Sequence, residues 1–140
     1  MPPTSPTPTM HALAGLRVLI LENNEDCLEM FAIYLRSCGA HVAAAQNVVE
    51  ALGYANGQRI DAILTDVSVL RGSVAHFLRD VREAPEYKDT PVIAVTGWTR
   101  EDATRLAQAS FSECIQKPVD MDVLVATIVR LAQPNAAQVS

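Results

Sequence analysis

Five polar residues of chemically useful types each follow a short apolar run of the chain. They are an acid beside an amide, a second acid, a threonine and a lysine: Glu22, Asn23, Asp66, Thr96 and Lys117. Taken singly, each has an ordinary structural explanation, because polar residues often end strands and form turns or caps. Lys117 is more specific, since it is one of two lysines in the chain and is followed by Pro118, which favours a point charge held at a fixed turn. Together, these carboxyl, hydroxyl and ammonium groups would make a charged polar site.

Whether these residues meet depends on the elements that carry them. Short apolar runs typical of strands occupy residues 17–21, 41–45, 60–65, 91–96 and 113–116. Helical spacing and capping residues predict helices over 25–38, 47–56, 73–83, from 99 onward, and over 120–132. Parallel neighbours need crossover connections, so this alternation predicts a doubly wound α/β fold, a parallel sheet with helices on both faces. In such a sheet the functional crevice lies beyond the carboxyl ends of the strands, where these polar residues would gather.

The order and spacing of four segments resemble the response-regulator receiver domain. The segments read Val18-Leu-Ile-Leu-Glu-Asn-Asn-Glu-Asp26, Ile63-Leu-Thr-Asp66, Val92-Ile-Ala-Val-Thr-Gly97 and Ile115-Gln-Lys-Pro-Val-Asp120. The resemblance covers about residues 16–132. It implies a flavodoxin-like (βα)5 fold with a five-stranded parallel sheet in the order 2-1-3-4-5.

The resemblance also implies a role for each residue of the site. Asp66 would attack the phosphorus of a phosphohistidine and carry the resulting acyl phosphate, which suits an ionised carboxylate at a strand end. Lys117 and Thr96 would contact the phosphoryl oxygens, and Gly97 would leave room for the incoming group. A chain of this kind is a signalling receiver and not an enzyme in the usual sense, because it acts only on its own phosphorylation.

A magnesium ion is the cofactor that the resemblance implies. Its ligands would be Glu22, Asn23, Asp66 and the backbone carbonyl of Ser68. Receivers usually carry a second acid where this chain has Asn23, and an amide oxygen is a weaker ligand for a hard cation. We therefore expect weak binding of Mg²⁺.

Three other positions depart from the pattern of the family. The aromatic residue that usually precedes the lysine by three positions is replaced by Cys114, so rotation of an aromatic ring cannot be the output signal. Ser68 and Trp98 hold the two positions that flank the approach of hydrolytic water, and the bulk of Trp98 predicts slow loss of phosphate. A partly exposed ring that only packs on the following helix is the alternative for Trp98.

Composition limits the other classes of function. A net charge of −5, with scattered basic residues, argues against binding to nucleic acid or to an anionic membrane surface. No apolar run is long enough to span a bilayer, and three cysteines without ligand spacing indicate reduced thiols in the cytoplasm. We expect a flexible Pro/Thr-rich tail at residues 1–14, a receiver domain at 15–133 and a flexible C-terminus at 134–140. Because the pattern begins soon after Met10, we also expect translation to start there.

The predicted function is transfer of a signal between proteins. A histidine kinase or phosphotransfer protein would phosphorylate Asp66, and a downstream protein would contact the surface of the fourth helix, fifth strand and fifth helix. The chain would act as a monomer or weak homodimer, either alone or as a piece of a hybrid kinase. One alternative is a pseudo-receiver that binds a partner without phosphorylation, because Asn23 and Cys114 depart from the family. A small flavodoxin-like enzyme or cofactor binder is less favoured, since no glycine-rich phosphate loop follows the first strand.

Overall fold

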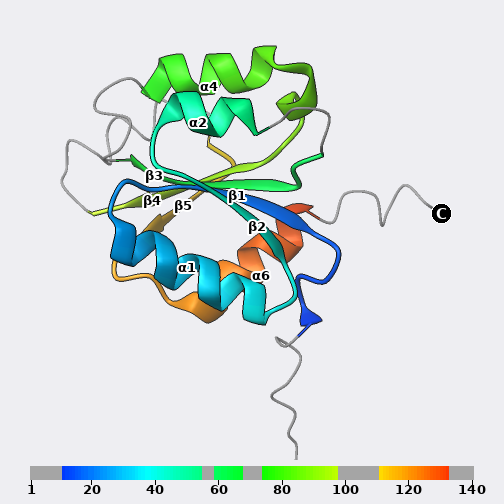
Figure 1. The fold of residues 1–140 in the computed structure, drawn as a ribbon, viewed down its shortest axis with the longest axis vertical. Coiled ribbons are helices and arrows are strands. Elements are labelled where there is room, and N and C mark those ends of the chain that lie inside the picture. The colour runs from blue at the N-terminus through cyan, green and yellow to red at the C-terminus, as the bar shows by residue number, and fades with distance from the viewer. Residues whose placement is uncertain (1–10, 55–58, 68–73, 98–110, 133–140) are drawn as a thin grey trace, which may run out of the picture.

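The structure of the protein is a computed structural model that describes residues 11–54, 59–67, 74–97 and 111–132. Five parallel strands form one sheet in the order β2-β1-β3-β4-β5. The strands are β1 (Arg17–Leu21), β2 (His41–Ala45), β3 (Ala62–Asp66), β4 (Val92–Thr96) and β5 (Glu113–Gln116). The helices are α1 (Glu25–Ser37), α2 (Val48–Gly53), α4 (Val74–Glu83), α6 (Met121–Ala132) and the short 3-10 turn η2 (Pro85–Tyr87). Helices α1 and α6 cover one face of the sheet, while α2 and α4 cover the other (Figure 1), so the predicted doubly wound fold and strand order are confirmed.

The sheet divides the apolar core into two layers. Side chains alternate along a strand, so Leu19 and Leu21 of β1 pack in the layer with α2 and α4, whereas Val18 and Ile20 pack with α1 and α6. All five residues of β3 and of β4 are buried. Burying one Leu, Ile or Val side chain stabilises a fold by about 1.5–3 kcal/mol, so the two central strands are firmly held. The polar residues at their ends are therefore fixed in position.

Both ends of α1 are set by local chemistry. The side chain of Asn24 accepts a hydrogen bond of 2.9 Å from the backbone N–H of Cys27, which caps the first turn. At the other end, Gly39 has a φ of +101°, and its N–H donates to the carbonyl of Arg36 at 2.9 Å. A Cβ at residue 39 would lie 3.0 Å from the backbone nitrogen of Ala14. Glycine is therefore required there both by the left-handed backbone and by the close approach of the chain.

The first described residues pack against the fold ahead of β1. Leu13 is fully buried and packs in the layer that α1 and α6 cover. Its backbone N–H also donates to the carbonyl of Cys38 at 2.9 Å. An apolar side chain and a paired backbone thus hold this segment to the fold before residue 15. Residues 1–10 of the tail predicted at 1–14, and the C-terminus predicted at 134–140, lie outside the described residues.

Other predicted bounds differ by a few residues. Strand β3 begins at Ala62, two residues after the predicted start, and includes Asp66 as its last residue, paired with Val95 of β4. Helix α2 ends at Gly53, and its predicted end at residue 56 falls outside the described part. The same holds for the helix predicted from residue 99. None of the described helices is both long and apolar enough to cross a membrane.

Candidate functional site

Asp66 and Lys117 form an ion pair at the carboxyl edge of the sheet. Asp66 ends β3 and is 5% exposed, and the Lys117 Nζ donates to its Oδ2 at 2.8 Å. The backbone N–H of Lys117 donates to the carbonyl of Thr96 at 2.8 Å, which ties the segment after β5 to the end of β4. The hydrogen bond to Asp66 raises the pKa of Lys117 above its ordinary value, so this side chain is an ammonium at neutral pH.

Glu22 brings a second carboxyl group to Asp66. It follows β1, is 3% exposed, and its Oε2 accepts a hydrogen bond of 2.9 Å from the backbone N–H of Asn24. Burial raises the pKa of Glu22, and so do its hydrogen bond with Asp66 and the charge of Asp66, whereas the bond from Asn24 and the charge of Lys117 lower it. Two carboxyl groups thus share one ammonium. An oxygen-rich set of this kind with surplus negative charge fits a hard divalent cation.

Thr96 and Gly97 border the same edge from β4. Thr96 is the last residue of the strand, and its side chain is largely buried at 8% exposure. Its hydroxyl donates to the carbonyl of Gly97 at 3.4 Å, which is long for a hydroxyl hydrogen bond. Apart from its chain neighbours, no atom of the described residues lies within 4 Å of a Cβ added to Gly97, so the described part of the chain leaves open space above this strand end. A weakly held hydroxyl beside open space is available to a new partner.

The remaining predicted residues contribute less to the described geometry. Asn23 is exposed beside the buried Glu22. Cys114 lies in β5 opposite Ala94 of β4 and is exposed; its thiol is free, as are those of the other two cysteines. Ser68 and Trp98 lie outside the described residues. Within the described ranges, no group of three or more His, Cys, Asp or Glu side chains is placed to hold a metal. A cation at Glu22 and Asp66 would therefore need amide, backbone or water oxygens as well.

Asn24 has a role at the site that the sequence analysis missed. Its backbone N–H holds the Glu22 carboxyl group, while its side chain caps α1. One residue thus fixes the acid and the start of the helix together. The signal was present in the sequence, because an asparagine directly before an acidic first turn is typical of a helix N-cap.

Comparisons with known sequences place this geometry in a family. Residues 18–129 match the family model of the response regulator receiver domain. The polar-differentiation response regulator DivK of Brucella anthropi is 30% identical over 112 residues, which cover 79% of this chain and 91% of DivK. The CAI-1 autoinducer sensor kinase/phosphatase CqsS of Vibrio cholerae is 32% identical over 111 residues. That match covers 78% of this chain but spans only 16% of the kinase.

Solved structures agree with the sequence matches. The receiver domain of the sensor histidine kinase PA1611 from Pseudomonas aeruginosa, which has a magnesium ion coordinated in its active-site cleft, is 27% identical with a TM-score of 0.76. The alignment covers 85% of this chain and 98% of that domain. The chemotaxis response regulator CheY4 of Vibrio cholerae is 26% identical with a TM-score of 0.72, over 83% of this chain and 98% of that one. The chain therefore belongs to the family of response regulator receiver domains.

Proposed function

We propose that the chain accepts a phosphoryl group at Asp66 from a histidine kinase or a phosphotransfer protein and signals through a protein contact. The observation that carries this proposal is the 2.8 Å pair of Asp66 and Lys117 beside the buried Glu22, at the carboxyl edge of the sheet. Pairing with an ammonium favours the ionised form of a carboxyl group, which is the nucleophilic form.

The transfer step requires one bond to form and one to break. A carboxylate oxygen of Asp66 would bond to the phosphorus of the phosphohistidine, and the P–N bond would break with its electron pair remaining on the imidazole. The product is an acyl phosphate with additional negative charge at the site. Lys117 and the hydroxyl of Thr96 are the groups of this chain that would bind the phosphoryl oxygens.

Magnesium is the cofactor proposed for this step. Glu22 and Asp66 would hold it, together with Asn23 and the backbone carbonyl of Ser68. When bound, the ion would neutralise negative charge on the carboxylates and on the phosphoryl oxygens. The magnesium in the PA1611 receiver supports this proposal. Asn23 argues for weaker affinity than a second acid would give.

The phosphoryl donor and the target of the output signal are both proposed to be proteins. CqsS is named as a sensor kinase and PA1611 as a sensor histidine kinase, so close relatives of this domain occur within kinases. This supports a kinase or phosphotransfer protein as donor. For the output we propose the surface that β5 and α6 form with the helix predicted from residue 99, used by a monomer or weak homodimer in the cytoplasm.

A pseudo-receiver that binds its partner without phosphorylation is the second candidate, and Asn23 in place of an acid favours it. Purified protein incubated with acetyl phosphate separates the two. A receiver gains one phosphoryl group in intact mass when Mg²⁺ is present and much less when EDTA removes it. A pseudo-receiver shows no gain with Mg²⁺ at any donor concentration.

A further inference from the structure

Strand β2 forms an open edge of the sheet, away from Asp66. No strand of the described part of the chain lies beyond it. The N–H of His41 donates to the carbonyl of Leu16 at 2.9 Å, and the carbonyl of Ala45 accepts from Glu22 at 3.0 Å, so odd-numbered residues of β2 face β1. Backbone groups alternate in direction along a strand, so those of Val42 and Ala44 face outward.

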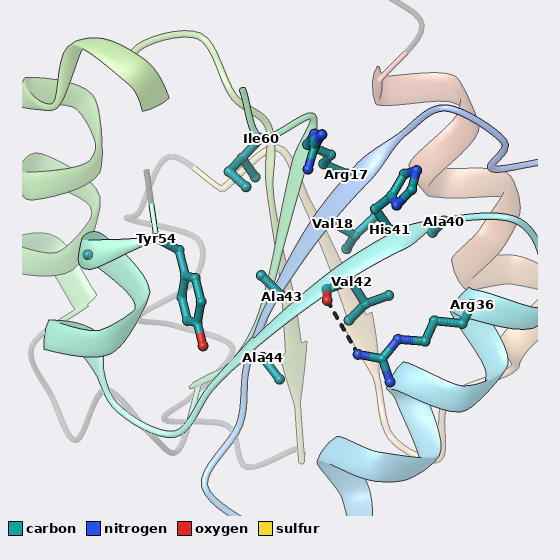
Figure 2. Close-up of a pocket in the computed structure, with 11 residues that line it drawn as sticks. Arg17, Val18, Arg36, Ala40, His41, Val42, Ala43, Ala44, Tyr54 and Ile60 are labelled. Atoms are coloured by element: carbon teal, nitrogen blue, oxygen red, sulfur yellow. Dashed lines mark hydrogen bonds between the residues drawn. The ribbon is translucent and has the colours of Figure 1, made fainter. Parts of the chain in front are cut away.

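The residues of β2 do little to protect this edge. Natural sheets usually block an edge with lysine, proline or a bulge, and β2 reads His-Val-Ala-Ala-Ala. The outward carbonyl of Val42 accepts from Nη2 of Arg36 at 3.4 Å, a long contact that a better donor could replace (Figure 2). An incoming strand could therefore bond to the backbone of β2 and release the Arg36 guanidinium.

A groove of about 880 Å³ runs along this edge. Figure 2 shows Arg36 of α1 on one side of β2 and Tyr54, which follows α2, on the other, with the small side chains of Ala43 and Ala44 between them. Large side chains thus flank the groove, and small side chains lie between them. None of the described residues assigned to the phosphoryl site lines it.

The charge of the groove indicates what it would bind. Arg17, Arg36 and His41 line it, and no acidic residue is among the described residues that do, although the whole chain has a net charge of −5. The acids Glu25, Asp26 and Glu29 line a neighbouring hollow past Ala44, which Arg36 also borders, so the basic character belongs to the side of Arg36 that faces the first half of β2. A ligand should therefore place its negative charge beside Arg36.

We propose that the β2 edge binds an extended, acidic peptide segment of a partner protein, which adds to the sheet beside β2 with its acids against Arg36. Main-chain hydrogen bonds to Val42 and Ala44 would supply affinity, and the guanidinium group would supply selectivity and register. This site is distinct from the phosphoryl site at Asp66.

The test is an NMR titration of the ¹⁵N-labelled full chain with synthetic peptides. The probes are acetyl-Glu-Val-Glu-Val-Thr-Val-Thr-Val and acetyl-Thr-Val-Thr-Val-Glu-Val-Glu-Val, which cover both strand directions, and each has a control with Gln in place of Glu. We expect at least one acidic probe to shift the amides of Val42 and Ala44 and slow their exchange with solvent. Its Kd should be at least about tenfold lower than that of its Gln control, a difference of about 1.4 kcal/mol.

Two pairs of variants separate strand addition from simple attraction of charge. Ala44→Pro removes the outward N–H, and an edge strand tolerates proline at such a position. This variant should bind the acidic probe about tenfold or more weakly. Ala44→Ser keeps the N–H and should bind the probe as wild type does. Arg36→Gln should weaken binding of the acidic probe and leave binding of its Gln control peptide unchanged. Unshifted amides elsewhere in the spectrum confirm that each variant is folded.

Several outcomes would overturn the proposal. They are absence of shifts at Val42 and Ala44 with both acidic probes, equal affinity for the Gln peptides, or equal binding by Ala44→Pro and Ala44→Ser. Tighter binding at this edge to phosphatidylserine vesicles or to a DNA duplex than to either acidic probe would identify a different ligand and would also overturn it.

Discussion

The carboxyl groups of Glu22 and Asp66 interact across β1 and β3, which pair in the centre of the sheet. Both side chains are almost fully buried. Burial and Asp66 together raise the pKa of Glu22, so the folded protein holds the Glu22 proton more tightly than the unfolded chain does. The two carboxylates thus repel each other, and a bound cation would reduce this repulsion.

This relationship predicts how stability changes with pH. Because the pKa of Glu22 is higher in the folded protein than its ordinary value of 4.5, the folded protein loses stability as pH rises from 4.5 through the folded pKa. Below pH 4.5 the group is protonated in both states and does not lower the free energy of unfolding. Glu22→Gln keeps the acceptor for the N–H of Asn24 and removes the charge. We expect it to raise the urea midpoint at pH 7, with a gain that shrinks toward pH 4.5 and disappears below it. Glu29→Gln, at an exposed position of α1, is the control and should leave the urea midpoint unchanged at both pH values. A lower midpoint for Glu22→Gln at pH 7 would show that attraction to Lys117 outweighs the cost of burial.

Removing the ammonium should have the opposite effect. Lys117→Met leaves two buried carboxyl groups without their cation, and loss of one partner of a buried pair is costly. Because the Lys117 side chain is 39% exposed, water screens part of this loss, and we expect a destabilisation of about 1–2 kcal/mol at neutral pH. Urea unfolding measures it, with Lys88→Met at an exposed position as the control. Equal stability of Lys117→Met and the wild type would mean that the ion pair is not formed in solution.

Restoring the second acid should strengthen the metal site. Asn23→Asp adds a negative charge beside Glu22, and we expect it to lower the Kd for Mg²⁺ by about tenfold, or about 1.4 kcal/mol, in a calorimetric titration. Asn24→Asp is a matched control, because it adds the same charge one residue later at a helix cap that accepts aspartate equally well. An equal gain in both variants would indicate general electrostatic attraction and not a ligand at residue 23.

The sequence predicts which elements form the fold better than it predicts which residues ahead of β1 pack against them. Buried strands such as β3 and β4 are continuous apolar runs between polar residues, so their existence and order follow from pattern alone. Leu13 stands between Ala12 and Ala14 in a segment with no strand or helix periodicity, and only its contacts in the core show that it packs with the domain.

The same limit applies to the site. Asp66, Thr96 and Lys117 could be named because strand ends and a family pattern fix their positions along the chain. The pairing of Glu22 with Asp66 depends on the distance between two elements, which spacing does not give, whereas the capping role of Asn24 is local and could have been predicted. The basic groove at β2 is also invisible in the sequence, since Arg36 and His41 belong to different elements.

Trp98 leads to a prediction about the lifetime of the signal, which comes from the sequence alone because the residue lies outside the described part. A large apolar ring two residues beyond Thr96 should hinder the water that attacks the acyl phosphate. We expect Trp98→Ala to lose phosphate faster, and a tenfold increase would need only about 1.4 kcal/mol in the barrier. Decay of phosphorylated protein after removal of the donor, at equal Mg²⁺, measures the effect. Unchanged or slower decay in Trp98→Ala would show that the ring does not hinder the attacking water and only packs against its neighbours.

Phosphorylation in vitro tests directly whether Asp66 is the phosphoacceptor. Wild type, Asp66→Asn and Asp89→Asn would be incubated with acetyl phosphate and Mg²⁺, and the phosphoryl group counted by intact mass. Asp89 is an exposed aspartate between η2 and β4, so its variant controls for a surface carboxyl group. We expect one phosphoryl group on wild type and on Asp89→Asn, and none on Asp66→Asn, with all three folded by circular dichroism. A folded Asp66→Asn that gains phosphate at the level of wild type would contradict this expectation.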